Sequence, residues 1–107
     1  MKPVGELDKI WRPWRQARLK EMLRFGMPKN SAETVSLAEA RARQRIANEV
    51  GVEAAKAAHL VVVPVRGVGE QIMLSVDPSL FEGLDCETAE ARLKPWGITM
   101  QIDSLFR

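Results

Sequence analysis

The spacing of apolar residues divides the chain into a helical first part and a second part of strand character. Apolar side chains recur at helical spacing over residues 11–25 and along one narrow face of residues 35–50. From residue 60 onward the pattern changes to short β-branched or alternating runs, bounded by glycine and proline. The sequence therefore predicts an α+β fold in which helices precede a small sheet.

Glycine and proline mark the ends of the first predicted helix. Pro13 suits the first position of a helix, because the N–H that it lacks would have no helical partner there. Gly26 and Pro28 should end this helix near residue 25, since glycine favours a helix C-terminus and proline cannot continue the helix. We expect residues 27–31 to form a turn.

A capping-box pattern marks the expected start of the second helix. Ser36 can accept a hydrogen bond from the backbone N–H three residues later, and Glu39 can reach back to the N–H of Ser36. We therefore expect this helix to begin at Ser36. Gly51 should interrupt or end it, with a short helical stretch over residues 52–58.

Three segments of the second part have the character of strands. Residues 60–65 and 71–76 flank a glycine-containing turn and should form an antiparallel hairpin. Asp85 can cap a short helix over residues 86–94, and residues 98–102 alternate as a third strand would. The predicted order is β-β-α-β, in a sheet that is at least partly antiparallel.

A single domain accounts for the 107 residues of the chain. Residues 1–10 are expected to be a loosely ordered lead-in, residues 11–58 the helical part, and residues 59–107 the ββαβ part. Three strands leave two sheet edges, and an open edge can pair with a second copy. A homodimer is therefore one expectation.

The sequence favours a cytoplasmic protein without a membrane segment. Residues 1–10 lack the apolar stretch of a signal peptide. The longest strongly apolar run, residues 60–65, is far shorter than the ~20 residues that cross a bilayer. One cysteine excludes an internal disulfide, which suits a reducing compartment.

Charge is distributed unevenly along the chain. Residues 1–30 hold eight Lys or Arg and three Asp or Glu, whereas residues 60–107 hold four basic and seven acidic residues. Such asymmetry indicates a basic end that meets an anionic partner. The alternative is that the two ends attract each other, within one chain or between two copies.

Residue types that support metal binding or catalysis are scarce. Structural zinc takes about four Cys or His ligands, and the chain has one of each. Cys86 and His59 are the only thiol–imidazole pair, and a lone cysteine is more often a small apolar residue than a nucleophile. We expect a non-enzymatic protein with no metal and no cofactor, with catalysis by Cys86 as a minor alternative.

Residues 45–60 loosely resemble a helix-turn-helix. Ala47 and Gly51 are spaced as the small residue and the turn glycine of that motif, and the following hairpin would be a wing. The second helix departs from the pattern, because it holds Glu53, four alanines and only Lys56 to meet a phosphate. Base readout uses Arg, Lys, Asn or Gln, so an Ala-rich helix packed on its neighbour is the favoured interpretation.

The stretch WRPWRQARLKEMLRFG, residues 11–26, strains the expectation of an ordinary core helix. On a helical wheel, Arg15 and Arg18 fall inside the apolar arc that includes Trp14 and Met22. In one interpretation the apolar residues are core, and the arginines bend outward or pair with acids. In the other, part of the arc is a contact surface, because Trp, Arg and Met are enriched at interfaces and arginine beside aromatic rings suits nucleic acid.

The preferred hypothesis is a nucleic-acid-associated regulator that uses this basic N-terminal region. The alternative is a protein–protein adaptor or inhibitor that uses the same surface. The residues assigned to the surface are Trp11, Arg12, Trp14, Arg15, Arg18, Lys20, Arg24, Arg41 and Arg45.

Overall fold

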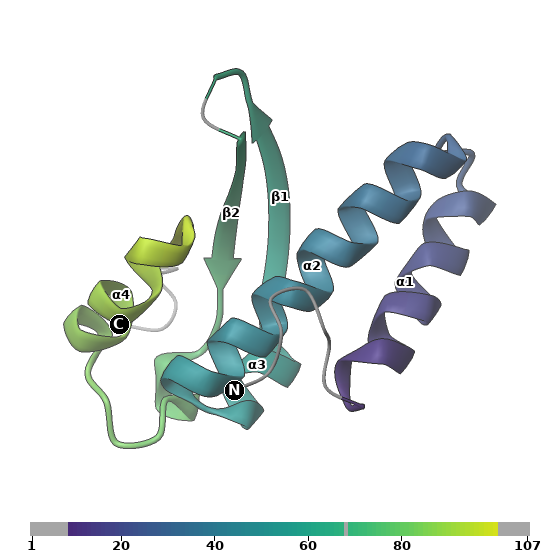
Figure 1. The fold of residues 1–107 in the computed structure, drawn as a ribbon. Helices are drawn as coiled ribbons and strands as arrows, with labels where there is room; N and C mark the ends of the chain where they lie inside the picture. The colour runs from purple at the N-terminus through teal and green to yellow at the C-terminus, as the bar shows by residue number, and fades with distance from the viewer. Residues whose placement is uncertain (1–8, 68, 101–107) are drawn as a thin grey trace.

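The computed structural model describes residues 9–67 and 69–100 (Figure 1). Within them the chain forms four α-helices, three strands and two 3-10 helices. In chain order these are α1 (Trp11–Arg24), α2 (Lys29–Val50), α3 (Val52–Ala57), β1 (His59–Val65), β2 (Gly69–Ser75), η1 (Pro78–Leu80), α4 (Cys86–Leu93), η2 (Lys94–Trp96) and β3 (Ile98–Met100). The predicted α+β class is confirmed, and the two 3-10 helices were not predicted.

The strands form one mixed sheet in the order β1-β2-β3. β1 and β2 pair antiparallel, as the hairpin prediction required, and β3 runs parallel to β2. Alternate residues share a face, so Leu60, Leu74 and Ile98 are buried while Val61 and Thr99 are exposed. The predicted end of the third strand, residues 101 and 102, lies outside the described residues.

Helix α2 is the centre of the structure. Figure 1 shows α1 on one side of α2 and the β1–β2 hairpin on the other, and α2 also contacts α3 and α4. Ile46 and Val50 of α2 are almost completely buried. They belong to one hydrophobic cluster that draws on Trp11 of α1, on α3 and α4, and on all three strands.

The expected start of α2 was wrong. The helix begins at Lys29, not at Ser36, and thus includes most of the turn expected over residues 27–31. Ser36 is fully buried, and its hydroxyl donates to the carbonyl of Glu33 at 3.1 Å. Glu39 instead accepts a hydrogen bond from Arg18 of α1. The serine and the glutamate share a spacing with a capping box, but inside a long helix that spacing only directs both side chains to the neighbouring helix.

Several other local signals acted as predicted. Pro13 is the exception: it lies in the first turn of α1, but as the third residue of the helix and not as its first, because the helix already begins at Trp11. The carboxylate of Asp85 caps α4 by accepting from the backbone N–H of Thr88 at 2.7 Å, and this hydrogen bond lowers the pKa of Asp85. Gly51 separates α2 from α3 with φ of 120° and ψ of 147°, a conformation that is essentially restricted to glycine.

We predict that Gly51→Ala lowers the free energy of unfolding by about 1–3 kcal/mol, because alanine is strained at this φ and ψ. The added Cβ would also lie 2.8 Å from Cγ of Glu82. Urea denaturation monitored by circular dichroism measures the loss. Gly26→Ala is the matched control, since its φ is +91° and its added Cβ meets nothing within 4 Å. Equal losses for the two variants would show that the break at Gly51 imposes no special constraint.

Candidate functional site

The two tryptophans of α1 have different environments. Trp11 is 1% exposed and belongs to the hydrophobic core, whereas Trp14 is 39% exposed. Their rings meet edge to face, with centroids 5.7 Å apart. Trp11 therefore offers no contact surface, which corrects its assignment to the binding region: its ring is buried in the core. Trp14 keeps a ring at the surface.

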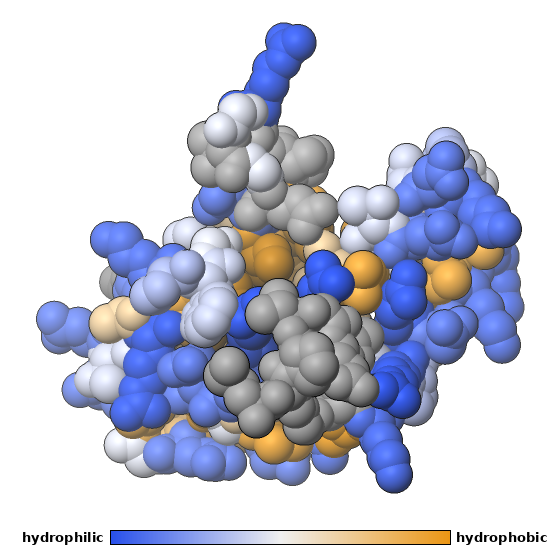
Figure 2. All heavy atoms as spheres, viewed as in Figure 1, coloured by the Kyte–Doolittle hydropathy of each residue, from blue (hydrophilic) through white to orange (hydrophobic). Residues whose placement is uncertain are grey.

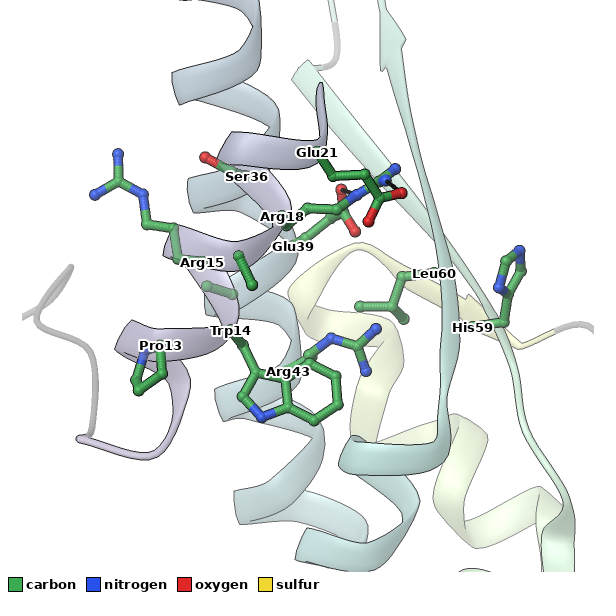
Figure 3. A pocket seen from close by; sticks show the side chains of 12 residues that line it. Pro13, Trp14, Arg15, Arg18, Glu21, Ser36, Glu39, Arg43, His59 and Leu60 are labelled. Atoms are coloured by element: carbon green, nitrogen blue, oxygen red, sulfur yellow. Dashed lines mark hydrogen bonds and ion pairs between the residues drawn. The ribbon is translucent and has the colours of Figure 1, made fainter. Parts of the chain in front are cut away.

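A cavity of about 580 Å³ lies between α1, α2 and the start of β1 (Figure 3). We call it the first cavity. Its lining combines apolar side chains, among them Trp14, Ala40 and Leu60, with a group of charged residues. Arg18 joins two acidic residues there: its Nη1 lies 2.8 Å from Oε1 of Glu21, and its Nε lies 3.0 Å from Oε2 of Glu39. The charge of Arg18 is thereby balanced within the protein.

Arg43 forms a second polar feature of the first cavity. Its guanidinium lies 4.6 Å from the centroid of the Trp14 ring, and its Nη1 donates to the carbonyl of Ala55 at 2.6 Å. Burial lowers the pKa of Arg43; the nearby Glu39 opposes this shift, and Arg18 adds to it. Sequence reasoning did not select Arg43, because its spacing from Glu39 is that of an ordinary surface pair along one helix.

Arg15 does not join this group. Arg15 also lines the first cavity, but Figure 3 shows its guanidinium directed away from Arg18 and Arg43. Its Nε is buried and has no hydrogen-bond partner within residues 9–67 and 69–100. The two arginines that fall inside the apolar arc of α1 thus differ: Arg18 pairs with acids, as the core interpretation expected, whereas the buried Nε of Arg15 has no such partner among the described residues.

A second cavity, of about 270 Å³, opens on the other side of α2. Arg43 and Arg45 are two residues apart on a helix, so they project in nearly opposite directions. Arg45 lies over the ring of Trp96, with its guanidinium carbon 3.8 Å from the ring centroid. Arg41 lines the same cavity. The remaining lining residues are Thr34, Leu37, Ala38, Ala42, Ile72 and Ile98.

Among the described residues, the lining of the second cavity contains two arginines and no acidic residue. Trp96 is 46% exposed, so the arginine covers only part of the ring. Its position depends on η2 and on Gly97, whose left-handed conformation (φ 73°, ψ 21°) turns the chain into β3. Sequence reasoning missed Trp96, because the residues around it were interpreted only as the end of a helix.

The predicted surface residues therefore do not form one patch. Trp11 is core, and two groups line cavities: Trp14, Arg15 and Arg18 line the first cavity, and Arg41 and Arg45 line the second. Arg12, Lys20 and Arg24 are exposed on α1. Figure 2 shows that hydrophilic side chains cover most of the visible surface on the side of the molecule where α1 lies.

The second helix of the suggested helix-turn-helix is short. α3 has six residues and follows α2 after Gly51 alone. Ala54 and Ala55 are buried, which leaves Glu53 and Lys56 as its exposed charged residues. Helix α3 therefore has few exposed side chains of the types that recognise bases in a DNA groove.

His59 and Cys86, the thiol–imidazole pair, do not line the same cavity. His59 lines the first cavity, and Cys86 is not among the residues of that lining. Cys86 is half-buried at the start of α4 and packs against the hydrophobic core. Within the described residues, no group of three or more His, Cys, Asp or Glu side chains is arranged to hold a metal ion.

No protein-family model matches the chain, and comparisons with curated proteins and with solved structures likewise found no match. In the part of the chain that the structure describes, no helix has the length and apolar character to cross a membrane. The geometry of the two cavities is therefore the basis for a functional proposal.

We predict that Trp11→Ala lowers the free energy of unfolding by about 3–5 kcal/mol, the usual cost of truncating a buried tryptophan. Trp14→Ala should cost clearly less, because part of that ring is already in water. Urea denaturation of both variants gives the comparison. A loss for Trp11→Ala no larger than that for Trp14→Ala would contradict the core assignment of Trp11.

Proposed function

We propose that this protein is a non-enzymatic, nucleic-acid-associated regulator whose contact surface centres on the second cavity. The observation that carries the proposal is the stack of Arg45 on the half-exposed Trp96, beside Arg41, in a cavity whose lining has no carboxylate among the described residues. Arg41 and Arg45, which the sequence had suggested, remain part of the proposed surface. Its aromatic component is Trp96, in place of the predicted Trp11 and Trp14.

These groups are of the kind that binds a polyanion with exposed bases. Guanidinium groups bind phosphate oxygens in a bidentate manner, and stacking on an aromatic ring limits the entropy that Arg45 loses when it does so. The uncovered part of the Trp96 ring can stack with a base, which is worth roughly 1–3 kcal/mol per base. The absence of an acidic group from the lining matters because a nearby carboxylate would compete with phosphate for the arginines.

Exposed basic residues on α1 extend the positive potential. Arg12, Lys20 and Arg24 are exposed on this helix, and Arg41 is exposed on the adjacent α2. Long-range attraction of this kind raises the rate of association and depends on ionic strength. In this proposal, α1 attracts the nucleic acid and the second cavity holds it.

Fluorescence polarisation with labelled duplex and single-stranded oligonucleotides, each at two salt concentrations, tests the proposal. Affinity should fall steeply with salt, because each neutralised phosphate releases counterions. Trp96→Ala should weaken binding to single strands by about tenfold, the loss of one stacked base. Arg41→Glu should weaken binding to every sequence and reduce the slope of log K against log salt by at least about 0.7.

Lys56→Glu is the matched control for Arg41→Glu. It makes the same change of charge at an exposed position on α3, outside the second cavity. Binding should be far less sensitive to this variant, whereas a helix-turn-helix mode would make it the more harmful change. Absence of binding at low salt, or equal losses for the two variants, would refute the proposal.

A second candidate function is an adaptor or inhibitor that binds another protein. One observation favours it: α1 and the residue after it leave large apolar side chains in water, with Phe25 80% exposed and Leu23 42% exposed. Large exposed apolar groups beside arginines are typical of residues that anchor protein interfaces.

For this second function, we predict that a partner captured from nuclease-treated lysate is lost with Phe25→Ser and kept with Trp96→Ala. Truncation of one interface anchor commonly costs 2 kcal/mol or more, about 30-fold in affinity. Quantitative affinity capture at moderate salt measures retention. The opposite pattern, loss with Trp96→Ala only, would exclude α1 as the docking surface.

A further inference from the structure

β1 is an edge strand, and the hydrogen bond at the far side of its neighbour shows which of its backbone groups point away from the sheet. The backbone N–H of Ile72 in β2 donates to the carbonyl of Gly97 at 3.0 Å, so Ile72 directs its backbone polar groups toward β3. Alternate residues of a strand direct these groups to opposite sides. The groups of Met73 therefore face β1, where its register partner is Val61.

The same alternation fixes the direction of every residue in β1. Val61 and Val63 direct their N–H and C=O groups to β2, because Met73 and Gln71 are their partners. Leu60, Val62 and Pro64 consequently direct theirs to the outer edge. Pro64 occupies a position at which its missing N–H removes no bond to β2, the usual place for proline in a sheet.

Strand β1 has no charged side chain to guard its outer edge, and its first residues border the first cavity, beyond which α1 and α2 lie. Its sequence, HLVVVPV, contains no Lys, Arg, Asp or Glu. Val61 is 47% exposed and Val63 is 37% exposed. Within the described residues, no further strand lies beside β1. Soluble proteins commonly guard such edges with charge, and here only Pro64 limits the length that can pair.

We infer that β1 pairs antiparallel with β1 of a second copy of this chain, about a two-fold axis at Val61. In this register Leu60 lies opposite the partner's Val62, and Val62 lies opposite the partner's Leu60. Each of these two pairs exchanges two N–H···O=C bonds, because all four residues direct their polar groups outward. Pro64 lies opposite the partner's Ala58, at the end of the ladder, where its carbonyl can still accept.

The register with its two-fold axis one residue further along the strand is poorer because of Pro64. A two-fold axis at Val62 would place Pro64 opposite the partner's Leu60, whose carbonyl would then face a residue that cannot donate. With the axis at Val61, the exposed faces of the two sheets also join into one continuous face. Val61 is in register with Met73 and then Thr99, so the two copies together form one row of six side chains across six strands.

The occupant is a second copy because the strand is complementary to itself. It has no charge with which to select a charged peptide, and its exposed valines suit identical valines. Val61 and the partner's Val61 form a non-hydrogen-bonded pair, in which Cβ atoms approach to about 4.5–5.5 Å. The result is a symmetric dimer with a self-complementary interface, the commonest form of homo-oligomer.

Cysteine crosslinking tests the register directly. In a Cys86→Ala background, which removes the native thiol, Val61→Cys should form a covalent dimer readily under mild oxidation, because its Cβ faces that of the partner. Val63→Cys is the matched control, since it is an exposed valine on the same face of the same strand. It would lie four residues out of register with its own copy, about 13 Å away, too far for a disulfide.

Light scattering after size exclusion tests the dimer itself, in nuclease-treated samples at high salt so that nucleic acid cannot bridge two copies. The full chain should run as a dimer, and Val61→Lys should run as a monomer, because like charges would lie directly opposite each other. Thr99→Lys, on the same face at the far edge, should leave the dimer intact. A monomeric wild type, a dimer that survives Val61→Lys, or efficient crosslinking by Val63→Cys would overturn the inference.

Discussion

Helix α2 must pack against two different neighbours at once, and the rest of the structure follows from how it does so. It meets α1 on one side and the sheet on another. Four of its buried residues are alanines, at positions 32, 38, 40 and 42. Small side chains allow the neighbouring elements to approach closely, while Ile46 and Val50 fill the space toward the sheet and α3.

The same arrangement explains why α1 leaves so much apolar surface in water. A helix packed on a single neighbour can bury only one narrow stripe, and α1 buries Trp11 and Met22. Leu23 and Phe25 lie outside this stripe and remain exposed. The attachment of α1 is completed by charge, since Arg18 reaches the buried Glu39 of α2. A carboxylate with so little exposure is costly unless it is paired, so this ion pair also fixes which face of α1 turns inward.

The sequence predicts much of the fold, because its strongest signals are local. Gly51 and Asp85 act through their own backbone or their nearest neighbours, and both were placed correctly. The start of α2 was missed because Ser36 and Glu39 satisfy a local rule while serving a contact with α1. A helical wheel gives the direction of Trp11 and Trp14 but not the distance to the next element, so it could not separate a buried ring from an exposed one.

The candidate site was predicted only in part, for a related reason. Arg41 and Arg45 were selected from charge, but the tryptophan that meets Arg45 lies 51 positions further along the chain, and only the packing of η2 against α2 brings them together. Arg43 was overlooked for the same reason, since its partners are Trp14 and the carbonyl of Ala55. Contacts between distant segments leave no periodic signal in either segment.

The 22 residues of α2 form one uninterrupted helix, and only Gly51 separates it from α3. This continuity restricts where residues can be inserted into the chain or deleted from it. Each residue of a helix turns the chain by about 100°, so one inserted residue anywhere in α2 would rotate everything before it relative to everything after it. An insertion in α2 before Arg43 would turn Arg43 away from Trp14, and an insertion after Arg45 would turn Arg45 away from Trp96. The turn before Lys29 lies outside α2, so a change in its length would leave the two arginines of the helix on their present faces.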